Sequence, residues 1–95
     1  MDDILVRNRS GEATVTVDVD VRAGDDLRLS ESATVDAGSA VPYDDVWSAT
    51  GEYTVTASRP GGDELTDTRT VRSTDDTLWI TVVQDGTLAF ELTRA

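Results

Sequence analysis

The side chains that this chain lacks narrow the chemistry open to it. Its 95 residues include no His, no Cys and no Lys, so the commonest nucleophiles and general bases near neutral pH are absent. Carboxylates remain, but a glycosidase needs two of them about 5–10 Å apart across a sugar-sized cleft. A chain of this length seldom forms such a cleft, so we expect no catalytic residue, no cofactor and no enzymatic activity.

Paired carboxylates are the first candidates for a binding site. Oxygen ligands suit Ca²⁺ where two loops converge, and Asp44, Asp45, Asp75 and Asp76 are the best ligands here if a metal binds. The chain has no Asp-x-Asp-x-Asp-Gly loop, and solvated turns explain the same residues without a metal, which is the interpretation that we favour. Four Asp-Asp dipeptides fall in predicted turns or strand ends, at 2–3, 25–26, 44–45 and 75–76.

The two indoles are the remaining candidates, because Trp combines apolar area with one hydrogen-bond donor and is favoured where a partner docks. We expect Trp47 to close one end of the fold beside Tyr53. Trp79 is predicted to point outward with Thr81 and Val83, as a contact surface for another domain or for self-association. A ligand-binding module is the alternative, with Trp79 for a carbohydrate or the Asp-rich turns for Ca²⁺.

Charge is the most specific feature of the composition. The formal net charge is −11, Asp outnumbers Glu fourteen to five, and all eight cations are Arg. Such a surface repels itself in dilute buffer, whereas at molar salt the Debye length falls to about 3 Å. We therefore expect folding to require high salt. The arginines are scattered, so binding to a nucleic acid backbone is disfavoured.

The stretch from Trp47 to Ala57 organises the predicted fold. Tyr53, Val55 and Ala57 alternate with polar residues, which is the period of a strand with one face in a core. Gly51 lets the chain turn a corner just before this strand. A Tyr at such a corner can bond its hydroxyl to upstream backbone while its ring packs inward. Gly51, Tyr53 and Trp47 are thus predicted to have structural roles.

Alternation and turn composition predict a series of short strands and no helix of useful length. In the second strand Ala13 is expected to share the buried face with four Val. In the third, Leu27 is expected on the same face as Leu29, and the intruding Glu31 indicates an edge, a bulge or a strand end. Pro42 limits the fourth to an edge strand or an extended loop. The predicted strands span 4–7, 13–21, 26–35, 40–46, 53–58, 64–72, 78–83 and 87–93.

The last hairpin has two possible registers, because its turn contains Asp85-Gly86. A two-residue loop places Trp79, Thr81 and Val83 on the face shared with Leu88, Phe90 and Leu92. A three-residue loop with a left-handed Gly86 pairs Val83 with Thr87, and the shared face is then Leu78, Ile80, Val82, Leu88, Phe90 and Leu92. We favour the second register because it collects six large apolar side chains, worth about 1.5–3 kcal/mol each on burial. It leaves Trp79 on the outer face.

These elements predict one domain over 1–95, an all-β, immunoglobulin-like antiparallel two-sheet sandwich of about seven or eight strands. No apolar run approaches the ~20 residues that span a bilayer, and Met1-Asp2-Asp3 does not resemble a signal peptide. Asn8-Arg9-Ser10 fits the Asn-x-Ser glycosylation pattern, which turn chemistry explains equally well.

The stretches VRNRSGEATVTV (6–17) and GEYTVT (51–56), with the Asp85-Gly86 hairpin, resemble small haloarchaeal immunoglobulin-like domains of the PKD-like and fibronectin-like group. The resemblance implies a non-catalytic structural or protein-interaction module from a halophilic archaeon, with no agreed activity and no site residues to transfer. It also implies a cell-surface or exported protein. The alternative location is the cytoplasm of a halophile that accumulates salt.

Overall fold

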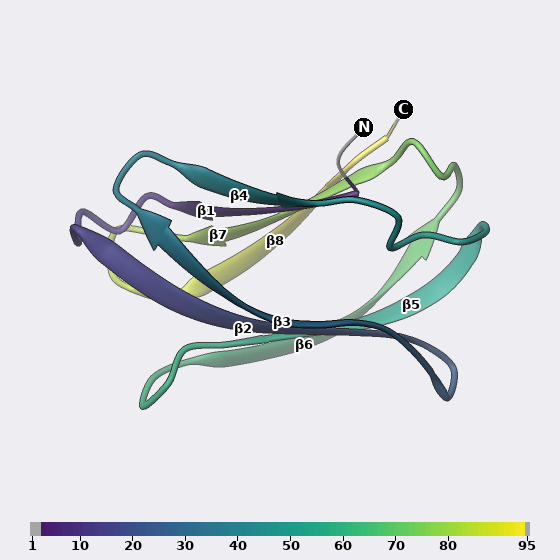
Figure 1. The fold of residues 1–95 in the computed structure, drawn as a ribbon, viewed down its shortest axis with the longest axis horizontal. Coiled ribbons are helices and arrows are strands. Elements are labelled where there is room, and N and C mark those ends of the chain that lie inside the picture. Colours follow the sequence, from purple (N-terminus) through teal and green to yellow (C-terminus); the bar gives the residue numbers. More distant parts are fainter. Residues whose placement is uncertain (1–2, 95) are drawn as a thin grey trace.

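Two four-stranded sheets pack face to face in the structure, a computed structural model that describes residues 3–94 (Figure 1). Asp2, which begins one Asp-Asp pair, lies outside the described residues. The first sheet has the order β4-β1-β7-β8, with β4 (Ala40–Tyr43), β1 (Ile4–Asn8), β7 (Thr77–Val82) and β8 (Leu88–Thr93). The second has the order β3-β2-β5-β6, with β3 (Asp26–Asp36), β2 (Thr14–Ala23), β5 (Gly51–Ser58) and β6 (Glu64–Val71).

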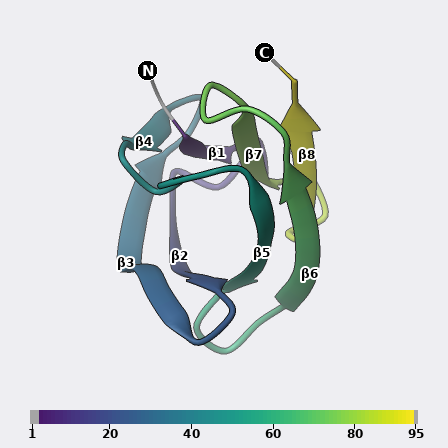
Figure 2. The same ribbon diagram turned by 90° about the vertical axis from the view of Figure 1, so that its right-hand side faces the viewer.

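The core lies between the two sheets and is made by strict alternation along the strands. In β2 the four Val are buried, while the intervening Thr, Asp and Arg residues lie on the outer side. Ala13 was expected on the same buried face, but β2 begins after it and Ala13 is exposed. The view along the long axis shows the sheets as two layers with the β2–β3 turn at one extreme (Figure 2).

The favoured register of the last hairpin is confirmed. Leu78, Ile80 and Val82 pair with Leu92, Phe90 and Leu88, and the residues of this set on β7 are fully buried. Gly86 has a φ of 86°, its N–H donates to the Val83 carbonyl, and the Val83 N–H donates to Thr87. A side chain on residue 86 would be strained at this φ, so the glycine holds the register that faces Trp79 outward.

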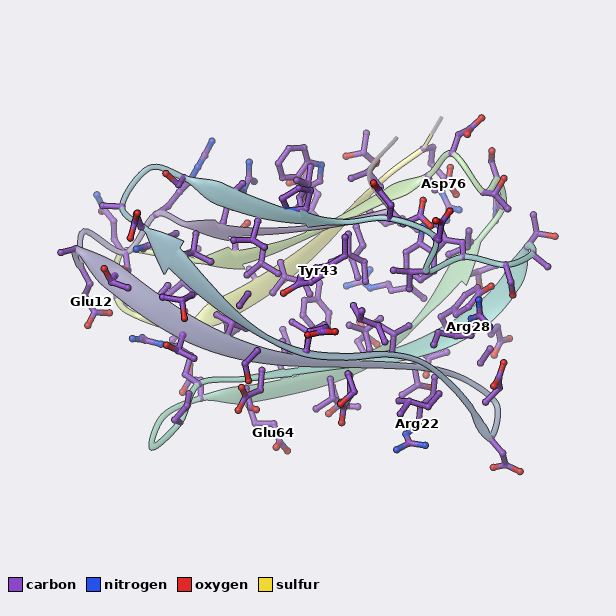
Figure 3. All side chains as sticks on the ribbon, in the orientation of Figure 1. Glu12, Arg22, Arg28, Tyr43, Glu64 and Asp76 are labelled. Atoms are coloured by element: carbon purple, nitrogen blue, oxygen red, sulfur yellow. The ribbon has the colours of Figure 1, made fainter. Side chains whose placement is uncertain are left out.

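The third strand is an edge strand with a bulge, as Glu31 indicated. The β2–β3 register shifts next to Val21, so Val21 pairs with Leu29 but Arg22 pairs with Leu27. The prediction that Leu27 shares the buried face with Leu29 is therefore wrong, because the extra residue of a bulge reverses the alternation. Leu27 lies on the outer face and is 47% exposed. Arg28 instead extends between the sheets, where its Nε donates to the Val46 carbonyl (Figure 3).

One strand pair departs from the expected antiparallel pattern. β1 lies between β4 and β7, antiparallel to the first and parallel to the second. The chain leaves β1 through a turn into the opposite sheet, so β1 has no hairpin partner of its own and pairs with strands distant in sequence. β4 is the predicted edge strand, and Pro42 lies in its middle.

Candidate functional site

Hydrogen bonds of the Tyr53 hydroxyl hold the corner that precedes β5. The Tyr53 hydroxyl donates to the Ala49 carbonyl at 2.7 Å, and the Ala49 N–H donates back to it at 3.3 Å. Gly51 has a φ of 142°, a conformation that side chains rarely adopt. The Trp47 and Tyr53 rings lie 4.7 Å apart between centroids, and both are buried. Trp47 thus closes this end of the sandwich.

The four paired carboxylates proposed for Ca²⁺ lie in two different environments. Asp44 and Asp45 are exposed, whereas the Asp76 side chain is 1% exposed and accepts hydrogen bonds from the Arg72 and Ser73 amides. The two loops do meet, but through the Trp47 indole N–H, which donates to the Asp76 carbonyl at 2.9 Å. Within residues 3–94 no group of three or more His, Cys, Asp or Glu is placed to hold a metal ion.

Buried carboxylates instead organise this end of the molecule, which the sequence pattern did not indicate. Asp3 accepts hydrogen bonds from the backbone N–H groups of Val46 and Trp47, at 2.8 and 2.9 Å. Asp76 also forms an ion pair with Arg94 at 3.3 Å. A carboxylate that satisfies backbone donors in this way fixes a loop, because unpaired buried amides are costly.

The glycosylation pattern at Asn8 is explained by its turn. Asn8 is 1% exposed, and its side-chain amide donates to the Val35 and Glu12 carbonyls at 3.2 and 3.0 Å. Its side-chain oxygen accepts from the Ser10 N–H and hydroxyl. A glycan on this nitrogen would have to displace these buried bonds.

The outer face of the β4-β1-β7-β8 sheet is the surface that contains Trp79. The strand pairing places Leu5 between Pro42 and Trp79 in one row, and Arg7 between Ala40 and Thr81 in the next. Trp79 pairs with Glu91, and Thr81 with Ala89. We define the Trp79 face as these eight residues: Leu5, Arg7, Ala40, Pro42, Trp79, Thr81, Ala89 and Glu91.

Arg7 organises the centre of this face, and the sequence did not reveal its role. Its guanidinium carbon lies 4.6 Å from the Trp79 ring centroid, within the range of a cation–π contact. Its Nε donates to the Thr81 hydroxyl at 2.7 Å. Thr81 is consequently only 6% exposed and presents little surface of its own. The third predicted contact residue, Val83, is half-buried just beyond the end of β7.

A shallow hollow of about 270 Å³ adjoins the Trp79 face. Arg7, Arg9, Ala40 and Trp79 contribute to its lining, with neighbouring residues of the turn after β3, and no carboxylate does. The largest hydrophobic and cationic groups of this face therefore border one concavity.

The outer face of the β3-β2-β5-β6 sheet is chemically opposite. The register places rows of Thr and Ser on it, and Leu27 is its apolar exception. Figure 3 shows Arg22 and Glu64 pointing from this face into solvent. Its carboxylates are Asp18, Asp20, Asp36, Glu52 and Glu64. Glu91 is the acid of the Trp79 face, so the two outer faces differ sharply in charge.

Two titratable groups lie in perturbed environments. Burial, and secondarily the charge of Glu31, raises the pKa of the Tyr43 phenol above its ordinary value near 10. The Thr87 hydroxyl and amide donate to the exposed Asp85 carboxylate at 2.6 and 3.0 Å and hold the pKa of Asp85 below its ordinary value. Both contacts belong to local packing and turn structure.

Comparison with known families assigns the chain. The model of the Halobacterial Ig-like domain family matches residues 12–95. The chain belongs to this family. Ig-like domains are generally non-catalytic and commonly serve as structural or interaction modules. The family agrees with the haloarchaeal composition and with the two-sheet sandwich, although β1 precedes the matched segment.

Comparisons with curated proteins and with solved structures found no match. In the part of the chain that the structure describes, no helix has the length and apolar character needed to cross a membrane.

Proposed function

We propose that this Ig-like domain is a non-catalytic module of a haloarchaeal cell-surface or exported protein, and that it contacts another protein through the Trp79 face. The contrast between the two outer faces carries the proposal. A halophilic surface gains solubility from hydrated carboxylates, yet this face retains an indole, Leu5 and Pro42 with Glu91 as its acid.

The composition of the Trp79 face matches that of contact surfaces. Interface cores are depleted in acidic residues and enriched in Trp and Arg. The Arg7 side chain is already ordered by Trp79 and Thr81, so docking costs little further side-chain entropy. A partner that covers this face desolvates few carboxylates, which keeps the electrostatic cost of binding low.

Carbohydrate and Ca²⁺ binding have weaker support. One face of the Trp79 ring is covered by the Arg7 guanidinium, where a sugar would stack. Of the four Ca²⁺ ligand candidates, Asp76 is buried and already accepts backbone hydrogen bonds from Arg72 and Ser73. No observation on the described residues favours either ligand over a protein.

Site-specific photo-cross-linking in haloarchaeal cells tests the contact. A cross-linking side chain replaces Ala40, on the outer face of β4, and in a matched variant Thr34, on the outer face of β3; both positions are exposed. We expect a protein adduct at residue 40 that disappears when Trp79→Glu is added, and no adduct at residue 34. Equal adducts at the two positions, or an adduct that survives Trp79→Glu, would refute the contact surface.

Protease shaving of intact cells tests the location. The full-length gene product is tagged and followed after protease is added outside the cells. We expect its loss from intact cells, with a cytoplasmic marker retained. Protection until the cells are lysed would contradict the surface or exported location while leaving the contact surface open to the cross-linking test.

A further inference from the structure

The four edge strands of the sandwich differ in how they block the addition of another strand. β3 carries a bulge and the inward-row Glu31, and β4 is four residues long with Pro42. β6 places Asp67 and Arg69, ion-paired at 2.9 Å, in the row that faces the core. Bulges, prolines, short length and inward charges are the devices by which natural sheets prevent edge pairing.

β8 has none of these devices. It is six residues long and contains no proline, and its pairing with β7 runs without a shift of register. It is the last strand of its own sheet, and Figure 2 shows the end of β6, from the opposite sheet, beside it. Its inward row is apolar, and Leu88, Phe90 and Leu92 are only partly buried against the core. Its charged residue, Glu91, points outward, where Arg7 lies 4.0 Å away.

The backbone of β8 has hydrogen-bonding groups directed to this open margin. The Val83 N–H donates to the Thr87 carbonyl, so Thr87 turns its backbone toward β7. Antiparallel ladders alternate, and each second residue faces the other way. Leu88, Phe90 and Leu92 therefore present their N–H and C=O groups to the open margin.

The sequence of this segment is nearly palindromic about Phe90. Residues 87–93 read Thr-Leu-Ala-Phe-Glu-Leu-Thr. An antiparallel copy centred on Phe90 pairs Thr with Thr, Leu with Leu and Phe with Phe, which are favourable cross-strand combinations. Ala89 then faces Glu91 of the second copy, so no two carboxylates lie directly opposite. Phe90 lies on the axis and Leu88 and Leu92 lie two positions away, so the three residues whose backbone groups face the open margin are the ones that pair.

We propose that β8 pairs antiparallel with β8 of a second copy of this chain, about a two-fold axis at Phe90. The pairing forms about six inter-chain hydrogen bonds, covers the half-exposed apolar row, and joins two four-stranded sheets into one. The same surface is used by both copies, so the assembly closes as a dimer. In this dimer the two Trp79 faces lie side by side. The role of the dimer rests on the proposed function, in which the Trp79 face contacts another protein, whereas the pairing of β8 does not.

The contact is small, because it joins two short strands, and its size is near the low end of specific interfaces. We therefore expect a dimer that forms reversibly as the protein concentration rises from micromolar to millimolar in molar KCl. Sedimentation velocity measures this equilibrium.

Ala89 provides the decisive substitution, since it is exposed and lies on the outer face of the sheet, opposite Thr81 and away from the core. Ala89→Glu sets a carboxylate opposite each Glu91 of the second copy, and Ala89→Arg sets a guanidinium there. We expect dimerisation about twofold to tenfold weaker for Ala89→Glu and stronger by a similar factor for Ala89→Arg. Thr68→Glu and Thr68→Arg, on the exposed outer row of edge strand β6, are matched controls and should leave the equilibrium unchanged.

A cysteine pair tests the register directly, because the chain has no other cysteine. The variant Ala89→Cys with Glu91→Cys is expected to form a disulfide-linked dimer under mild oxidation. The matched variant Thr66→Cys with Thr68→Cys on β6 should not. A monomer at every concentration for both wild type and Ala89→Arg, or equal cross-linking of the two cysteine pairs, would overturn the proposal.

The two failures are distinguishable. The photo-cross-linker at residue 40 lies on β4, at the opposite margin of the sheet from β8, so its adduct does not depend on β8 pairing. A monomeric protein that still gives this adduct would overturn the dimer and leave the Trp79 contact standing. A dimer that gives no adduct at residue 40 would overturn the Trp79 contact and leave the dimer standing.

Discussion

Tyr53→Phe tests whether the corner is held by the phenol hydroxyl or only by the packing of the ring. The substitution keeps the ring against Trp47 and removes a donor at 2.7 Å and an acceptor at 3.3 Å, both to Ala49. Ala49 is exposed, so water can take over its backbone groups. The loss is therefore that of an ordinary hydrogen bond, about 1 kcal/mol in the free energy of unfolding.

Thermal unfolding in molar KCl, followed by circular dichroism, measures the effect. A loss of about 1 kcal/mol lowers the Tm of a domain of this size by about 4–8 °C. Tyr43→Phe is the matched control: its phenol points between the sheets (Figure 3), and among residues 3–94 no hydrogen bond to it is found. We expect Tyr43→Phe within about 0.5 kcal/mol of wild type. Equal losses for the two variants would refute the hydroxyl bond as the cause.

Three further outcomes follow from charge and pKa. Dilution from molar to millimolar salt should abolish the cooperative melt, and an undiminished melt would contradict the salt requirement. Thr87→Val should raise the pKa of Asp85 toward its ordinary value, which carboxyl NMR titration measures. In the wild type, the stability that comes from the lowered pKa of Asp85 is present at pH values above the ordinary pKa. It is lost as pH falls through the lowered pKa. Glu31→Gln should lower the pKa of Tyr43 only in part, because burial is the larger cause, as ultraviolet titration would show. An unchanged Tyr43 pKa in the Glu31→Gln variant would exclude the Glu31 charge as a cause of the shift. The contribution of Tyr43 to stability is present below about pH 10 and is lost as pH rises through the raised pKa.

Local patterns were sufficient for most of the fold. Alternation identified the strands, and the choice between two registers of the last hairpin was correct because Gly86 and the apolar content of one face both pointed to it. The corner at Tyr53 was equally readable, since a glycine two residues before a Tyr fixes both the turn and the direction of the ring. These features depend on residues close in sequence.

Features that depend on distant residues were not readable. Arg7 meets Trp79 only because β1 lies parallel to β7, and a parallel pair has no turn to announce it. Leu27 turned outward because one extra residue near Val21 reversed its alternation. Asp3 and Asp76 looked like solvated turn residues, yet each accepts backbone hydrogen bonds that bury it.

The distribution of carboxylates connects the two proposals. A contact on the β3-β2-β5-β6 sheet would remove water from Asp18, Asp20 and their neighbours, and each buried carboxylate without a partner is costly. On the other sheet Glu91 is the acid of the outer face, and Arg7 already lies beside it. The same sheet also carries the one edge strand, among residues 3–94, that lacks a device against pairing. The chain has a net charge of −11, and selection for solubility keeps acidic residues on surfaces that form no contact. Acidic residues are scarce around β8 and Trp79. This scarcity is the pattern expected of a surface that contacts protein.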